Sequence, residues 1–225
     1  MEHNVISIAI DGPAGAGKST IAKRVAKNLG YIYVDTGAMY RAMAVHFIRN
    51  GIAADETEKI EAACDDVSVT IRYVNCEQQV ILNGENVNAF LRTEEVGKMA
   101  SASSVVPKVR MKLVELQRQL AQTDNVVMDG SDIGTYVLPD ARVKSYMTAG
   151  IRERALRRYE ELLQKGTECN LEEIEKDIAE RDYRDMNRDF APLRQAEDAV
   201  YLDTSKMSID EVAEEVGRIV ASKTL

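Results

Sequence analysis

The sequence predicts an α/β fold in which a parallel sheet is flanked by helices, and three observations support this. Short apolar runs alternate with stretches of helical periodicity at both ends of the chain, a pattern typical of parallel strands joined by helices. Between residues 67 and 73, apolar and polar residues alternate singly, and a second apolar run follows at residues 80–82, which indicates a small antiparallel insert. The 225 residues contain no repeat, low-complexity segment or interdomain linker, so we expect a single domain.

The N-terminal segment predicts a strand, a helix and a second strand. Val5 to Ile10 is a continuous apolar run, and apolar residues recur at helical spacing from Ile21 to Leu29, before Gly30 as a C-terminal cap. Tyr31 to Val34 is a second short strand, followed by an amphipathic stretch that ends near Asn50. Two strands joined through a helix indicate parallel pairing.

The rest of the chain predicts a hairpin, further strands and charged helices. Val80 to Leu82 leads into Asn83-Gly84, the strongest short hairpin signal. Helical periodicity resumes from Val109 to Leu120. Three further apolar runs are candidate central strands: Val126 to Met128, Val143 to Met147 and Ala199 to Leu202. Two charged helices lie between the last two runs, and Ser208 to Glu211 is a capping box that opens a terminal helix.

The composition argues against several functions. With 29 Lys plus Arg against 37 Asp plus Glu, the net charge of −8 disfavours nucleic acid as a partner. His3 and His46 have no plausible nucleophile nearby in the sequence, so a Ser-His hydrolase and a histidine metal site are not expected. The three cysteines, Cys64, Cys76 and Cys169, lack metal-ligand spacing and should stay reduced. The N-terminal apolar run is too short to span a membrane, which favours a cytoplasmic protein.

Residues 12 to 20 carry the strongest functional signal. Gly12, Gly17, Lys18 and Ser19 match G-x-x-x-x-G-K-[ST], and the loop is entered from a strand and left through a helix, as this motif requires. Glycines let backbone N–H groups approach phosphates, Lys18 neutralises their charge, and the Ser19 hydroxyl can ligate Mg²⁺. We therefore expect ATP with Mg²⁺, bound by Gly12, Pro13, Ala14, Gly15, Ala16, Gly17, Lys18, Ser19 and Thr20.

Asp129 is a candidate metal ligand. It follows the apolar run Val126 to Met128, so it should emerge at the carboxyl edge of a strand beside the glycine-rich loop. There it would serve as a Walker-B-type acid that holds Mg²⁺. Because Gly130 comes next, a turn-forming aspartate is the alternative interpretation.

One predicted helix changes character along a single face. At 3.6 residues per turn, Ile174, Ile178, Arg181, Asp185 and Arg188 fall on this face, which begins apolar and becomes charged. Such a face either lines a cleft for a polar anion or forms a solvated ladder of ion pairs.

The preceding helix is crowded with arginines at positions 152, 154, 157 and 158. In an acidic protein that binds phosphate, these side chains suit closure over a transferring phosphoryl group. Pairing with the glutamates of the same helix is the alternative.

Together these segments resemble bacterial cytidylate kinases. The residues concerned are Ile8-Ala-Ile-Asp-Gly-Pro-Ala-Gly-Ala-Gly-Lys-Ser-Thr20, Asp35-Thr-Gly-Ala-Met-Tyr-Arg41, Asp132-Ile-Gly-Thr135, Arg181-Asp-Tyr-Arg-Asp185, Ala191-Pro-Leu193 and Asp203-Thr-Ser205. The resemblance covers nearly the whole chain, with the motifs in the same order.

The resemblance implies a P-loop kinase that transfers the γ-phosphoryl group of ATP to CMP or dCMP. It divides the chain into a core (about 1–35, 104–150 and 191–225), a monophosphate-binding region with the insert (about 36–103) and a mobile helical lid (about 151–190). We expect a cytoplasmic monomer whose partners are ATP and CMP or dCMP.

The resemblance also assigns residue roles. Contacts with the monophosphate substrate are implied for Thr36, Arg41, Ser101, Arg110, Asp132, Arg181, Asp185 and Arg188. Catalytic roles are implied for Lys18, Arg41, Arg154, Arg157, Arg158 and Arg188, and metal contacts for Ser19 and Asp129.

The residue types suit cytosine. Its amino group can donate to Asp132 and its carbonyl can accept from Arg110. Uracil presents a carbonyl to the Asp132 carboxylate instead, so we expect discrimination against UMP of ~1–3 kcal/mol per misread contact. The attacking oxygen belongs to an ionised phosphate, so no strong base is needed.

Ser131 departs from the family pattern, which usually has Arg there, in contact with the substrate phosphate. Loss of a charge-assisted hydrogen bond costs ~1.5–3 kcal/mol, so we expect weaker CMP binding or slower turnover than in a Ser131→Arg variant.

Two other functions fit parts of the sequence. One is a kinase of another small acceptor, such as UMP or shikimate. The other is a P-loop nucleotide-binding regulator with weak or lost kinase activity. The sequence lacks the guanine-reading motif N-K-x-D, and its arginine-dense segment favours transfer over switching.

Overall fold

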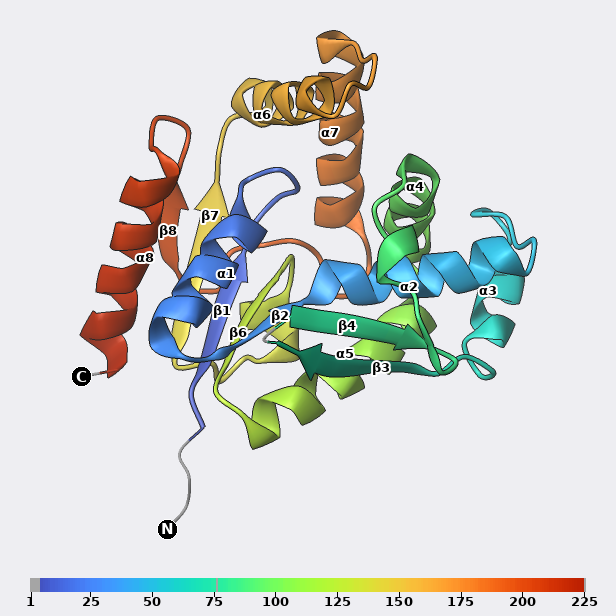
Figure 1. The fold of residues 1–225 in the computed structure, drawn as a ribbon, viewed down its shortest axis with the longest axis horizontal. Coiled ribbons are helices and arrows are strands. Elements are labelled where there is room, and N and C mark those ends of the chain that lie inside the picture. Colours follow the sequence, from blue (N-terminus) through green and yellow to red (C-terminus); the bar gives the residue numbers. More distant parts are fainter. Residues whose placement is uncertain (1–4, 76, 225) are drawn as a thin grey trace.

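A five-stranded parallel sheet in the order β2-β6-β1-β7-β8 forms the centre of the computed structural model, which describes residues 5–75 and 77–224 (Figure 1). Its strands are β1 (Ser7–Asp11), β2 (Ile32–Asp35), β6 (Val126–Gly130), β7 (Val143–Thr148) and β8 (Val200–Asp203). The helices that cover it are α1 (Lys18–Leu29), α2 (Thr36–Arg49), α5 (Pro107–Thr123) and α8 (Ile209–Thr224). The predicted parallel α/β fold is confirmed. His3 and Cys76 lie outside the described residues.

The central strands bury side chains on both faces of the sheet. Ile8, Ile10 and Val127 belong to a cluster with apolar residues of α1 and α8. Ala9 and Met128 point the other way and join a larger cluster with α2, α5 and the insert. Successive side chains of a strand alternate between faces, so helices on both faces require the continuous apolar runs seen in the sequence.

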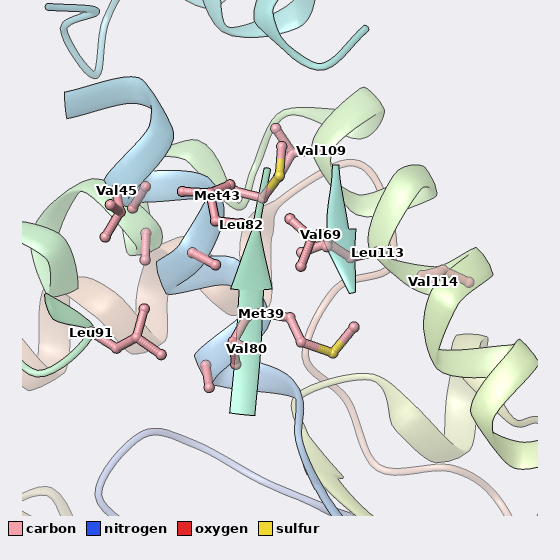
Figure 2. Packing of buried hydrophobic residues seen from close by; sticks show 14 of the residues in the cluster. Met39, Met43, Val45, Val69, Val80, Leu82, Leu91, Val109, Leu113 and Val114 are labelled. Carbon is pink, nitrogen blue, oxygen red and sulfur yellow. The ribbon is translucent and has the colours of Figure 1, made fainter. Parts of the chain in front are cut away.

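The predicted insert is a three-stranded antiparallel sheet, formed by β3 (Val69–Val74), β4 (Glu77–Leu82) and β5 (Glu85–Asn86). Asn83 and Gly84 connect β4 to β5 with φ angles of 49° and 88°, as the favoured two-residue hairpin turn requires. Val80 and Leu82 of β4 belong to the cluster shared with α2 and α5, where Val80 lies near Met39 and Leu82 near Met43 (Figure 2). The insert therefore packs onto the core of the molecule.

Side chains of the insert also bind the free edge of β2. Gln78 accepts a hydrogen bond from the Asp35 amide at 2.9 Å and donates one to the Asp35 carbonyl at 3.1 Å. The Tyr73 hydroxyl donates to the Tyr33 carbonyl at 3.1 Å. These bonds satisfy backbone groups that an edge strand leaves unpaired, and they hold the point where β2 passes into α2.

Two features of the sheet differ from the sequence-based expectations. β1 and β2 are parallel but do not pair with each other, because β6 lies between them. β8 is an edge strand rather than a central one, and Tyr201 on its outer face is 56% exposed. The apolar run in β8 reflects partial burial of Val200 and Leu202 against the cluster that contains α8.

The two charged helices predicted between β7 and β8 are α6 (Ile151–Gln164) and α7 (Leu171–Asn187), which lie above the carboxyl edge of the sheet (Figure 1). The remaining helical segments are α3 (Thr57–Ala63), α4 (Glu94–Ser103) and the short turns Asn88–Phe90 and Ile133–Val137. The predicted capping box is present, since Ser208 N donates to the Glu211 carboxylate at 2.8 Å and Glu211 N to Ser208 Oγ at 3.3 Å. None of the helices in the described ranges is long and apolar enough to cross a membrane.

Replacement of Gln78 tests the contact between the insert and β2. We expect Gln78→Ala to lower the free energy of unfolding by about 1–3 kcal/mol, because two hydrogen bonds worth roughly 0.5–1.5 kcal/mol each are lost. Gln79→Ala is the control, because Gln79 follows on the same strand and its side chain points to the opposite face. Urea denaturation measures both, and equal losses in the two variants would contradict the stabilising role of Gln78.

Candidate active site

The glycine-rich loop joins β1 to α1 in a conformation that its glycines permit. Gly12 has φ of 146°, and a Cβ at this position would lie 1.8 Å from the Met147 carbonyl oxygen of the neighbouring strand. Gly15 and Gly17 have φ of 78° and 86°, in the left-handed region that favours glycine. The loop therefore places its backbone against β7 and opens at the N-terminus of α1, which suits an anion.

Lys18 lies at the start of α1 and turns back over this loop. Its Nζ donates a hydrogen bond to the Pro13 carbonyl at 2.8 Å. Burial lowers the pKa of Lys18 and the nearby Asp129 carboxylate opposes this, while the Arg181 guanidinium lowers the pKa further. Lys18 thus lies between a carboxylate of the sheet and an arginine of α7.

Asp129 lies at the end of β6 and receives two hydroxyl groups. Ser19 Oγ donates to Asp129 Oδ2 at 2.7 Å, and the Tyr33 hydroxyl donates to Oδ1 at 2.8 Å. Burial and the Asp35 carboxylate raise the pKa of Asp129, against the effects of Lys18 and the two hydroxyls. Sequence reasoning missed Tyr33, because its contact depends on β2 lying next to β6.

Ser19 and Asp129 are the residues of this edge that suit a metal ion. Their side-chain oxygens are 2.7 Å apart, and both are hard donors of the kind Mg²⁺ prefers. Within residues 5–75 and 77–224, no group of three or more His, Cys, Asp or Glu side chains could enclose a metal. Mg²⁺ in phosphoryl-transfer sites is typically held by one or two protein side chains together with phosphates and water, so two ligands fit it.

In the turn that follows β6, Asp132 forms a buried ion pair with Arg110 of α5. The Arg110 guanidinium lies 5.2 Å from the centre of the Tyr40 ring and also donates to the Ser104 carbonyl at 3.2 Å. Arg110 Nε is buried and has no hydrogen-bond partner among the described residues. A buried donor without a partner is uncommon, so this atom calls for an explanation.

Arg188 lies against the same pair, but it is not on the helix face predicted for it. α7 ends at Asn187, and Arg188 has extended backbone with φ −69° and ψ 143°. Its Nε donates to the Ala191 carbonyl at 2.8 Å, and its guanidinium lies 3.3 Å from Asp185 and 3.7 Å from Asp132. Arg188 therefore fits the helical spacing in the sequence but lies just after the helix ends. Its side chain still reaches Asp185 and the Arg110–Asp132 pair.

Ser131 joins this cluster through a contact that the sequence did not predict. Its Oγ accepts a hydrogen bond from Arg188 Nη2 at 2.9 Å and donates one to Asp132 Oδ1 at 3.3 Å. Burial and the neighbouring Arg110 lower the pKa of Arg188. The serine thus supplies a neutral partner beside two guanidinium groups.

The other predicted substrate-contact residues come from α2, α4 and α7. The buried Thr36 hydroxyl donates to the Asp129 carbonyl at 2.6 Å. Ser101 on α4 accepts from Arg184 Nη1 at 2.7 Å, a contact with α7 that sequence reasoning missed. Arg181 is half exposed and lies 3.8 Å from Asp185.

Several cations converge on Arg41. Burial lowers the pKa of Arg41, and Arg92, Arg181 and Arg158 lower it further, whereas Asp35 raises it. Arg92 was not predicted from the sequence. Its Nη2 lies 2.9 Å from the Asp35 carboxylate. A guanidinium whose pKa is lowered by neighbouring cations favours the binding of an anion.

The arginines of α6 differ in their surroundings. Arg154 is buried and forms a two-point ion pair with Asp182 of α7 at 3.1 and 2.5 Å, while its Nη1 also donates to the Ala14 carbonyl of the glycine-rich loop at 2.8 Å. Arg157 donates to the Thr204 carbonyl at 2.7 Å. Arg158 is exposed and pairs with Glu161 of the same helix at 2.9 Å, so the alternative of pairing within α6 applies to it.

This combination of sheet order, glycine-rich loop, buried carboxylate and clustered arginines defines a phosphate-loop kinase. Solved structures with a similar fold include a shikimate kinase from Bacteroides thetaiotaomicron, with a TM-score of 0.50 and 12% identity over 98% of this chain and 99% of that one. An uncharacterized protein from Eubacterium ventriosum gives a TM-score of 0.54 at 12% identity over 96% and 98%. At such identities the likeness concerns the fold alone.

The family is shown by sequence comparison. The family model described as cytidylate kinase matches residues 8–222. The chain is 47% identical to a cytidylate kinase from Ligilactobacillus salivarius over 97% of both chains. It is 49% identical to one from Caldicellulosiruptor saccharolyticus over 94% of this chain and 93% of the relative. The chain therefore belongs to the cytidylate kinase family.

The ion pair between α6 and α7 gives a test of how the helices are held over the glycine-rich loop. We expect Asp182→Ala to lower the free energy of unfolding by roughly 3–5 kcal/mol, because Arg154 stays buried without its counter-charge. Glu161→Ala removes an exposed carboxylate that pairs with Arg158 and Lys165 and should cost less than about 1 kcal/mol. Chemical denaturation measures both values. A loss for Asp182→Ala as small as that for Glu161→Ala would exclude a strong coupling through Arg154.

Proposed function

We propose that this protein transfers the γ-phosphoryl group of ATP to CMP or dCMP, giving ADP and CDP or dCDP. The observation that carries the proposal is the buried Arg110–Asp132 pair in the same molecule as a glycine-rich phosphate loop, with an Arg110 Nε that has no hydrogen-bond partner in the described part of the chain. Membership of the cytidylate kinase family supports the same reaction. The protein is proposed to act as a cytoplasmic monomer, where both nucleotides are available.

On the donor side, residues 12 to 20 would bind the ATP phosphates through backbone N–H groups, with Lys18 beside the β- and γ-phosphates. Ser19 and Asp129 would hold Mg²⁺, because their side-chain oxygens already lie 2.7 Å apart. Bound Mg²⁺ supplies positive charge that orients the phosphates and offsets charge developed during transfer. Arg154, Arg157 and Arg158 would lie on the α6 side of the transferring group.

On the acceptor side, Asp132 and Arg110 would read the cytosine edge. The cytosine amino group donates to the carboxylate, and its ring carbonyl accepts from the guanidinium. Thr36, Arg41 and Ser101 would also contact the nucleotide. Arg181, Asp185 and Arg188 would complete the contacts with its sugar and phosphate.

The chemistry requires positioning and charge stabilisation more than acid–base groups. An oxygen of the acceptor phosphate attacks the γ-phosphorus, the bond from that phosphorus to the β–γ bridging oxygen breaks, and ADP leaves with the electron pair. The attacking oxygen is already ionised at neutral pH, so no side chain has to remove a proton. The cations around Arg41 and Lys18 would stabilise the charge on the equatorial oxygens.

A coupled assay of ADP release tests this function directly. With ATP and Mg²⁺ present, CMP and dCMP should support turnover, and UMP should lose roughly one to two powers of ten in kcat/KM for each misread contact. AMP and shikimate serve as further acceptors in the same panel. Equal kcat/KM for CMP and UMP would contradict the base-reading role. ATP binding without acceptor-dependent ADP release would indicate a nucleotide-binding regulator instead.

Ser131 gives a second prediction. Ser131→Arg should lower KM for CMP about tenfold, because a charge-assisted hydrogen bond to the phosphate is worth ~1.5–3 kcal/mol. The same variant should melt at a lower temperature without nucleotide, because the new guanidinium lies next to Arg188 and replaces its hydroxyl partner.

Steady-state kinetics and thermal melts measure the two effects of that variant, with Ser131→Ala as the control that removes the hydroxyl without adding charge. An unchanged KM in Ser131→Arg would mean that the other arginines already bind the acceptor phosphate fully.

A further inference from the structure

Asp11 is a buried carboxylate that has no part in the reaction described above. It is the last residue of β1 and directly precedes Gly12 of the phosphate loop. Its Oδ1 accepts a hydrogen bond from Ile133 N at 2.7 Å, and its Oδ2 accepts one from Gly134 N at 2.6 Å. Both oxygens are therefore bound to the backbone that immediately follows Asp132.

The turn after β6 is built for this close approach. A Cβ on Gly134 would lie 3.2 Å from Asp11 Oδ2 and 3.1 Å from Lys144 Cδ, so any larger residue would press on the carboxylate or on the Lys144 side chain. A Cβ on Gly130 would lie 2.7 Å from Ile133 Cδ1, so the other end of the turn is equally close-packed. Asp132 lies between these two fixed points.

The backbone of Asp132 is neither strand nor helix, with φ −151° and ψ 22°. Its carbonyl accepts hydrogen bonds from Tyr136 N at 2.9 Å and Val137 N at 3.1 Å, which close the short turn Ile133–Val137. The two amides bound by Asp11 belong to the first two residues of this turn, so Asp11 holds the backbone of the turn that Asp132 opens.

We propose that Asp11 is a positioning residue for acceptor recognition, which holds the Asp132 carboxylate in fixed register with the phosphate loop. This inference rests on the proposed function. The end of β1 is then linked to both substrate sites. Gly12 of the ATP-binding loop follows Asp11 in the chain, and Asp132 of the acceptor site directly precedes the two amides that Asp11 binds. A change at Asp11 alters base reading without removing a group that touches either nucleotide.

Asp11→Asn tests the inference, since it keeps the size of the side chain but replaces one acceptor oxygen with an NH₂ donor facing a backbone N–H. We expect the ratio of kcat/KM for CMP over UMP to fall about tenfold, with KM for CMP raised and KM for ATP changed less than threefold. Amide hydrogen exchange at residues 132–136 should be faster than in the wild type.

Val216→Ala is the matched control, because Val216 is fully buried in the cluster of α8 and lies outside the acceptor turn. It should lower thermal stability and leave the CMP/UMP ratio unchanged. A lower melting temperature in Asp11→Asn with an unchanged ratio would overturn the positioning role. A wild-type protein without CMP-dependent ADP release would overturn the proposed function instead, so the two failures are distinguishable.

Discussion

The parallel register of the central sheet is the constraint on which the site depends. In the strand register, Asp35 lies opposite Asp129 and Asp11 lies opposite Gly130, so β2, β6 and β1 end at the same level. Parallel strands need crossovers that return over the sheet, and their carboxyl ends therefore open into loops at one edge. The phosphate loop, the start of α2 and the turn at Asp132 come from distant parts of the chain, and this register alone brings them together.

That edge gathers four carboxylates, and each is satisfied in a different way. Asp11 binds two backbone amides, Asp35 pairs with an arginine of the insert region, and Asp132 pairs with Arg110. Asp129 receives two neutral hydroxyls, and its pKa is raised by burial and by Asp35. Buried like charges raise one another's pKa unless cations offset them. The position of Asp129 beside Ser19 suits the metal-binding role proposed for it.

The sequence predicted the elements whose signals are local, such as the cap at Gly30, the turn at Asn83-Gly84 and the Ser208 capping box. It could not predict contacts that depend on strand order. Tyr33 reaches Asp129 only because β2 lies beside β6, and no periodicity within either segment reports this adjacency. Arg188 was placed on a helix because its spacing fits, but the Ala191 carbonyl holds it just beyond the helix end. Such contacts follow from tertiary packing rather than from local propensity.

The arrangement of arginines explains how an acidic protein can bind two nucleotides. The net charge of −8 repels phosphates at long range, but Arg41 lies among three other guanidinium groups that lower its pKa. Repulsion among these cations makes the folded protein less stable while no anion is bound. Donors fixed in advance need no reorganisation when charge develops, which is the main source of stabilisation in phosphoryl transfer. Ser131 gives Arg188 a neutral hydrogen-bond partner. An arginine at position 131 would add a further positive charge beside Arg188 and repel it in the protein without nucleotide.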